Sequence, residues 1–173
     1  MTISELLNDK QVKPKDKTEI ISSWILSGSI SVKELIKFAT SSKDPVKATC
    51  IEALEFATKI TPEIATLDCL AFVSTSLAEK APRIKWESAK VIGNIAHLFP
   101  DNLGTAIRNL LSNTEHPGTV VRWSAAFALG QVLKLNTKVN KALLPAIENI
   151  CQREEKNSIR KLYFAAVKKV EKG

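Results

Sequence analysis

The sequence has few of the features that mark secreted or membrane proteins. Its 173 residues include only three cysteines, and Cys50, Cys69 and Cys151 are too far apart to suggest a disulfide framework or a metal site. No apolar run approaches the roughly 20 residues needed to cross a bilayer, and the N-terminus lacks the pattern of a signal peptide. We therefore expect a cytoplasmic protein, not associated with membranes, with buried and reduced thiols.

Catalytic and cofactor-binding patterns are also missing. The chain has no phosphate-cradling glycine loop, no metal-ligand spacing and no nucleophile elbow. His97 and His116 are unrelated in position, and His116 falls in a turn. Glu87, beside Lys85 and Trp86, is the best candidate acid, but neighbouring helix positions point about 100° apart. We predict no enzymatic activity, with no catalytic, cofactor-binding or metal-binding residues.

What the chain does contain is a repeat. A pair made of an aliphatic and a basic residue begins at Val46, Ile84, Val121 and Ile159, at intervals of 37 or 38 residues. Each copy opens a stretch whose small and aliphatic residues recur at helical spacing, and each follows another helical stretch. Self-similarity of this period is typical of helical solenoids.

We predict one domain over residues 1–173, built from a capping helix and stacked helix pairs. The capping helix lies in 1–29 and the pairs in 30–60, 61–99, 100–135 and 136–173. In the second pair we expect the first helix to begin with Thr61 as its cap and Pro62 at its first position, and to continue through Ile64. Gly93 and Gly130 fall at one repeat position. Because glycine inside a helix costs about 1 kcal/mol relative to alanine, we expect helices to approach closely there.

The third repeat carries the clearest family resemblance. Val121-Arg122, Ala125 and Leu129-Gly130 resemble the second helix of HEAT repeats, an armadillo-like α-solenoid family. Two other copies match more loosely: Ile84-Lys85 with Ile92-Gly93, and Val46-Lys47 with Leu54. The resemblance covers residues 30–172. It implies an all-α fold, a right-handed α-α superhelix of about four helix pairs, in a family that mostly supplies binding surfaces.

Four cations share one repeat position and should align along the stack: Lys47, Lys85, Arg122 and Arg160. A cation at a helix N-terminus opposes the helix dipole, at a cost of roughly a few tenths to 1 kcal/mol. Acids in the preceding turns could offset that cost, and the available ones are Asp44, Glu79, Glu115 and Glu155. The alternative is a free row of cations on the concave side that meets phosphates or acidic side chains.

Two tryptophans follow these cations in neighbouring repeats. Trp86 and Trp123 lie off the aliphatic stripe by about two helical steps, in phase with Lys90 and Phe127 respectively. They either pack between repeats or form exposed anchors for a ligand. The candidate partner-binding residues are therefore Lys47, Lys85, Trp86, Lys90, Arg122, Trp123, Phe127 and Arg160.

The net charge of +7 is concentrated at one end, because residues 118–173 hold eleven basic and four acidic side chains. We predict a non-enzymatic scaffold that binds a protein partner through its concave face. The alternative is nucleic-acid binding through the basic C-terminal third, which would resemble the HEAT-like DNA alkylation repair glycosylases. Phe164, at the repeat position of Ala89 and Ala126, should be partly uncovered on the terminal helix and could support self-association.

Overall fold

The computed structural model describes residues 1–172, and within that range all regular structure is helical. None of the described helices is both long enough and apolar enough to span a bilayer. The α-helices are α1 (Ile3–Asn8), α2 (Pro14–Ser27), α3 (Val32–Thr40), α4 (Asp44–Ile60), α5 (Leu67–Ser76), α6 (Pro82–Ile95), α7 (Gly104–Asn113), α8 (Thr119–Lys134), α9 (Asn140–Arg153) and α10 (Asn157–Lys172). Two short 3₁₀ helices join them, η1 (Pro62–Ile64) and η2 (Ala96–Leu98).

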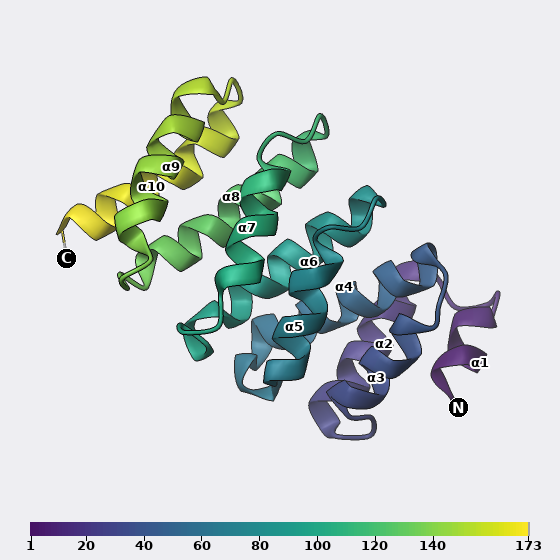
Figure 1. The fold of residues 1–173 in the computed structure, drawn as a ribbon. Coiled ribbons are helices and arrows are strands. Elements are labelled where there is room, and N and C mark those ends of the chain that lie inside the picture. The colour runs from purple at the N-terminus through teal and green to yellow at the C-terminus, as the bar shows by residue number, and fades with distance from the viewer. Residues whose placement is uncertain (173) are drawn as a thin grey trace.

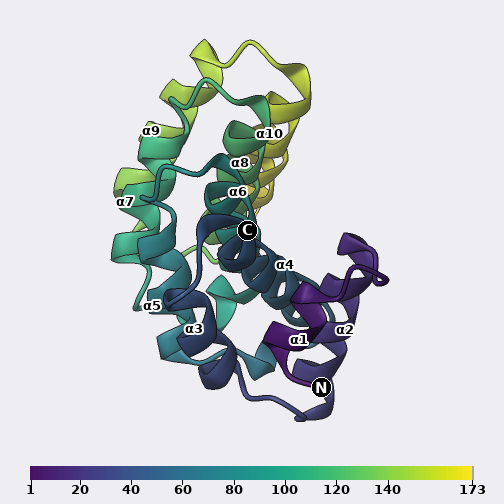
Figure 2. The same ribbon diagram turned by 90° about the vertical axis from the view of Figure 1, so that its right-hand side faces the viewer.

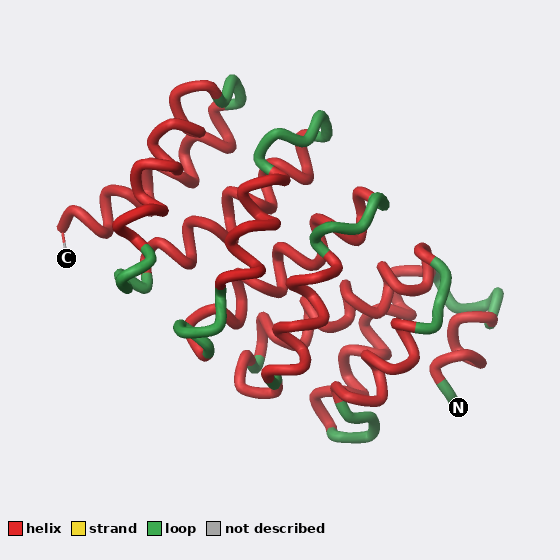
Figure 3. The backbone as a smooth tube through the Cα atoms, in the orientation of Figure 1, coloured by secondary structure: helices red, strands yellow, loops and turns green. Residues whose placement is uncertain are grey.

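From α3 onward the helices form pairs that stack along one direction: α3/α4, α5/α6, α7/α8 and α9/α10 (Figure 1). The first helices of the pairs form one layer and the second helices form another (Figure 2). The turns inside the pairs lie along one edge of the stack, and the turns between pairs lie along the opposite edge (Figure 3). The chain thus adopts the predicted right-handed α-α superhelix.

Local sequence explains where several helices begin. Pro14, Pro45 and Pro82 lie in the first turn of α2, α4 and α6, where a backbone N–H would have no partner inside the helix. Ser31 caps α3, because its hydroxyl accepts from the Glu34 N–H at 3.1 Å. The Glu34 carboxylate accepts from the Ser31 N–H at 2.7 Å, which completes a capping box.

The predicted helix start at Thr61 is wrong. Pro62–Ile64 forms the separate turn η1, and Ala65 is extended, with φ −71° and ψ 143°. The helix α5 begins only after Thr66, whose hydroxyl accepts from the Cys69 N–H at 3.2 Å. Thr66 therefore caps α5 and determines where it begins, whereas Thr61-Pro62 precedes only the isolated turn η1.

The second helices of neighbouring pairs pack closely against one another. A Cβ atom built on Gly93 in α6 would lie 2.3 Å from Cε1 of Phe127 in α8. One built on Gly130 in α8 would lie 3.4 Å from Cβ of Ala166 in α10. The expected close approach is confirmed at both glycines. The neighbouring side chains differ, however. The Phe127 ring lies against Gly93, whereas the methyl group of Ala166 lies at an ordinary contact distance from Gly130.

The N-terminal end holds two helices where one was predicted. The additional helix α1 packs on α2, and its Leu6 is 1% exposed. Lys17 on α2 donates to the carbonyl of Leu7 at 2.7 Å, which fixes the end of α1. A helix of six residues is too short to show a helical period, so sequence pattern did not reveal it.

All three cysteines are free and buried, as predicted. Desolvation raises the pKa of Cys50 and Cys69 to about 12. Because the thiolate is the reactive form, we expect a disulfide reagent at pH 8 to label these two thiols only as fast as the protein opens. Denaturant should expose three reactive thiols. Rapid labelling of Cys50 or Cys69 in the native protein would contradict this arrangement.

Candidate binding surfaces

The aligned cations lie at the edge of the stack where the two helices of each pair are joined. Lys47 on α4 is ion-paired with Glu79, in the turn before α6. Lys85 on α6 donates to Oδ1 of Asn113, at the end of α7, at 3.0 Å, and to the carbonyl of Leu77 at 3.1 Å. Desolvation lowers the pKa of Lys85. Both Glu79 and Asn113 belong to the pair that follows the cation.

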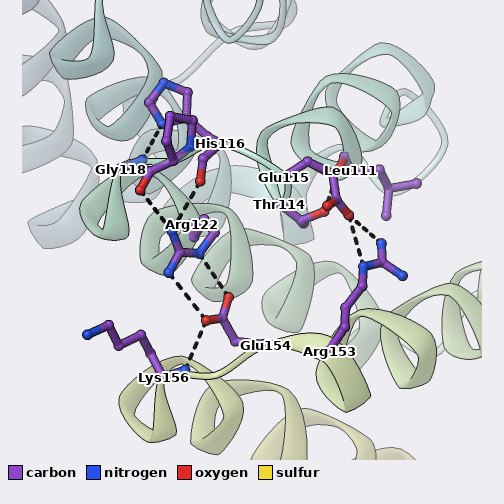
Figure 4. A network of polar contacts seen from close by, with 10 residues as sticks. Leu111, Thr114, Glu115, His116, Gly118, Arg122, Arg153, Glu154 and Lys156 are labelled. Atoms are coloured by element: carbon purple, nitrogen blue, oxygen red, sulfur yellow. Dashed lines mark hydrogen bonds and ion pairs between the residues drawn. The ribbon is translucent and has the colours of Figure 1, made fainter.

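Arg122 on α8 links two turns in the same way (Figure 4). Its Nε donates to Glu154 at 3.0 Å, and its Nη1 donates to the carbonyls of His116 and Pro117 at 3.1 and 3.0 Å. The Glu154 side chain is only 6% exposed. Desolvation acts to raise its pKa, but hydrogen bonds from Arg122 and from the Lys156 N–H hold the pKa of Glu154 below its ordinary value.

These contacts correct the expected partners of the cations. Acids were expected in the preceding turns, whereas the acidic or amide partners lie in the following pair. The preceding turns of Lys85 and Arg122 supply backbone carbonyls instead. Glu115, one of the expected partners, is ion-paired with Arg153 at the surface instead (Figure 4). A free row of cations on the concave side does not fit Lys47, Lys85 and Arg122, because the next pair already engages them.

Arg160 has the same repeat position on α10 but a different environment. Its Nε is buried and has no hydrogen-bond partner among residues 1–172. The guanidinium carbon lies 5.5 Å from the ring centroid of Phe164. The Phe164 side chain is 54% exposed, which confirms the prediction that it is partly uncovered.

A second surface is the inner face, defined as the side of α4, α6, α8 and α10 that points away from the first helices. On α6, Ile84 and Val91 belong to the fully buried stripe. Trp86 lies two steps of about 100° from Ile84 and so points to the opposite side, and Lys90 follows one turn later. The indole Nε1 of Trp86 donates to Glu87 at 2.9 Å, which holds the ring in place.

The equivalent positions on α8 carry Trp123 and Phe127. Their rings are stacked, with centroids 5.9 Å apart and planes inclined by 11°. Trp123 is 37% exposed, and Phe127 lies against Gly93 of the preceding pair. The repeat position therefore brings Trp86, Lys90, Trp123 and Phe127 to the inner face, while the four aligned cations lie at the edge.

Sequence analysis missed the polar links between α4 and α6 beside these aromatics. Arg83 is ion-paired with Glu52, and Asn94 donates to the carbonyl of Glu55 and the hydroxyl of Thr58, both at 3.2 Å. The partners occupy different repeat positions on successive helices. A search for matching repeat positions could not detect these contacts, and no other pattern in the sequence indicated them.

The candidate acid has no arrangement that indicates catalysis. Glu87 is 4% exposed, and burial raises its pKa. Its oxygens contact Trp86 and, at 3.4 Å, Lys90. His97 and His116 make no hydrogen bond with it in the described part of the chain. No group of three or more potential metal ligands was found among the described residues.

No family model and no curated protein matches the chain, but solved structures of repeat proteins do. A computationally designed armadillo repeat protein for modular peptide recognition has a TM-score of 0.73 at 15% identity, over 96% of this chain and 80% of its own. A designed armadillo repeat protein in complex with the peptide (KR)4 has a TM-score of 0.56 at 13% identity, over 97% of both chains. An engineered protein has a TM-score of 0.66 at 20% identity, over 80% of this chain and 37% of its own. The fold is therefore an armadillo-like repeat.

Proposed function

We propose that the protein is a non-enzymatic scaffold whose inner face binds a peptide segment of a partner protein. The observation that carries the proposal is the stacked pair of Trp123 and Phe127, with Trp123 exposed on that face. Aromatic side chains held rigid and partly exposed are frequent anchors in protein interfaces. Trp86, one repeat earlier, extends the apolar surface along the same face.

The structural neighbours support a peptide as the ligand. One was designed for peptide recognition, and another is in complex with the basic peptide (KR)4. We also infer that the repeats of this protein are of the HEAT type. The sequence pattern of Val121-Arg122 and Leu129-Gly130 supports that assignment.

Charge indicates which peptides this face prefers. The side of the helices that carries the aromatics also carries Lys90 on α6, Lys134 on α8 and Lys161 on α10. Lys161 has the repeat position of Trp123. Complementary charge steers association and selects partners. We therefore infer that the segment is acidic and carries an apolar or aromatic residue for the Trp123 and Phe127 pair.

The test is peptide selection followed by substitution of the aromatics. A displayed library of short peptides selected on the protein should yield acidic sequences with an aromatic or aliphatic anchor. Replacing Trp86 and Trp123 together with alanine should weaken binding of the selected peptides by at least about tenfold, the loss of one hot-spot residue. Fluorescence polarisation with labelled peptides measures this loss, and circular dichroism checks that helicity is kept.

Phe164→Ala supplies the matched control, because it removes an exposed aromatic side chain from α10 and leaves the inner face intact. This variant should bind the selected peptides as the original protein does. Equal affinity in the double tryptophan variant would reject the proposal. Loss of helicity in that variant would show that the tryptophans act mainly in packing, and Phe127→Ala would then be the decisive variant.

A second candidate is binding of single-stranded nucleic acid by the same face, favoured by the stacked aromatics beside lysines. It predicts affinity for an oligonucleotide that falls steeply as salt rises. An absence of binding at low salt would dismiss it. A glycosylase activity is not proposed, because Glu87 is buried and engaged by Trp86.

A further inference from the structure

A row of basic side chains on the inner face is not engaged by the rest of the stack. We call it the inner row, and it has one member near the end of each second helix: Lys59, His97, Lys134 and Lys172. Each member follows the valine or isoleucine that opens its repeat by thirteen residues. Lys59 and His97 are exposed and Lys134 is half-buried. Within residues 1–172, none of the four takes part in an ion pair.

The inner row points to the same side as the aromatic side chains. Lys134 follows Phe127 by seven residues on α8, and His97 follows Lys90 by seven residues across α6 and η2. Seven residues make about two turns of an α-helix, so such side chains lie on one side, about 10 Å apart along the axis. The inner face therefore has two borders that run along the stack, with the aromatics on one and the inner row on the other.

The helix dipole alone does not account for this row. A cation anywhere in the last turn of a helix interacts favourably with the dipole, yet all four repeats place one at the position on the inner side. The exposure does not come from a missing neighbour either, because α4 packs between α2 and α6, α6 between α4 and α8, and α8 between α6 and α10. Unpaired cations repeated beside an exposed aromatic pair indicate a site for anionic groups.

We propose that the inner row binds the acidic side chains of an extended segment of the partner protein, one acidic residue for each helix pair. The proposal rests on the function proposed above for the inner face and specifies its ligand. Packed neighbouring helices lie about 8–10 Å apart. In a polyproline II segment, every third side chain points the same way, about 9 Å further along. Such a segment, laid along the stack, offers an acid to each member of the inner row and an apolar side chain to the aromatics.

The charges on α4 and α6 favour such a segment over a nucleic acid. Glu52 and Glu55 lie on the same side of α4 as Lys59, and on α6 Glu87 lies 3.4 Å from Lys90 and partly neutralises it. A continuous phosphate backbone would pass all of these carboxylates, and like charges at an interface oppose association. Acids at every third residue meet only the inner row.

The probe is a labelled synthetic peptide of four Glu-Leu-Pro triplets, in which the prolines favour the polyproline II conformation. We expect it to bind the 173-residue chain in fluorescence polarisation. A peptide of the same composition with its glutamates adjacent should bind about tenfold more weakly, because it leaves at least two ion pairs unmade, each worth up to about fivefold.

Substitutions in the protein test the row itself. Lys59→Gln and Lys134→Gln should each weaken binding of the triplet peptide by about threefold, the effect of one exposed ion pair. Lys141→Gln is the matched control, because Lys141 is an exposed lysine of α9 in the other layer. It should bind as the original protein does.

The register of the peptide is measured with a double-mutant cycle. One of the two terminal glutamates should face Lys59. Replacing it with glutamine should remove the effect of Lys59→Gln and leave the effect of Lys134→Gln, because only charges in contact are coupled.

The proposal is overturned if the triplet peptide does not bind, or if both peptides bind equally well. It is also overturned if Lys141→Gln weakens binding as much as Lys134→Gln, since net charge alone would then be responsible, or if an oligothymidine competes more strongly than the peptide does. Normal binding by Lys59→Gln and Lys134→Gln, with loss of binding in Trp86→Ala with Trp123→Ala, would reject the inner row and leave the inner-face function standing.

Discussion

Gly93→Ala is expected to lower the free energy of unfolding by about 2 kcal/mol, although alanine is the better helix former. The new Cβ would lie 2.3 Å from the Phe127 ring, so the ring must leave its place against α6. That movement ends the stacking of Phe127 on Trp123, worth about 1 kcal/mol, and overpacking of this kind costs about 1–3 kcal/mol. Urea unfolding followed by circular dichroism measures the change.

Gly130→Ala is the matched control, one repeat later at the same position. Its Cβ would meet the nearest atom, Cβ of Ala166, at an ordinary 3.4 Å. Here the gain in helix propensity of up to about 1 kcal/mol should remain, so the variant should be as stable as the original or more stable. Equal effects of the two alanines would show that the Phe127 ring does not occupy the space above Gly93.

Gly93→Ala should also weaken peptide binding at the inner face. The displaced Phe127 no longer supports Trp123, and the apolar anchor loses its fixed geometry. The fluorescence of Trp123 reports the change directly. In a protein with Trp24 and Trp86 replaced by phenylalanine, its emission should shift to longer wavelength in Gly93→Ala and stay unchanged in Gly130→Ala.

Arg122→Gln is expected to destabilise the protein by about 2–3 kcal/mol, because it leaves the nearly buried Glu154 carboxylate without its charged partner. It also removes the hydrogen bonds to the carbonyls of His116 and Pro117. Arg153→Gln is the control, since Arg153 and Glu115 form an ion pair at the same edge with side chains 55% and 61% exposed. Exposed pairs contribute about 0–1 kcal/mol, so this variant should unfold almost as the original does.

Acid should reduce the difference between Arg122→Gln and the original protein. The folded state holds the pKa of Glu154 below its ordinary value, so the pair stabilises the protein above that ordinary value and loses its effect as pH falls through the lowered pKa. Urea unfolding at pH 7 and in mild acid tests this. A gap that stays constant on acidification would mean that the carbonyl contacts of Arg122, and not its pairing with Glu154, carry the effect.

Much of the architecture could be predicted because buried positions recur at regular intervals along the sequence. Apolar residues at helical spacing identify the side of each helix that faces its partner, and a period of 37 or 38 residues implies that successive pairs pack alike. The same reasoning anticipated close approach at Gly93 and Gly130 and the exposure of Phe164. It also predicted that Trp86 and Trp123 lie on the same side of their helices, because each is about two helical steps from the aliphatic stripe.

Other features of the structure do not correspond to any periodic pattern in the sequence. The six residues of α1 are too few to show a period, and the start of α5 depended on which of two threonines capped a helix. The partners of Lys47 and Arg122 lie 32 residues away along the chain, in the following pair. Which turn a long cation reaches depends on the offset between neighbouring helices, and the offset is a property of the assembled stack.

The order of residues alone was sufficient to specify helix pairs, their stacking and the side that each helix buries, because these follow from hydrophobic periodicity within single helices. Tertiary packing decided the rest. Close contact between α6 and α8 placed the Phe127 ring over Gly93 and so built the aromatic pair of the inner face. The position of each pair relative to the next determined the partners of Lys47, Lys85 and Arg122, and it left Arg160 beside an exposed Phe164. Such contacts depend on rotations and translations of whole helices, which the sequence of a single helix does not reveal.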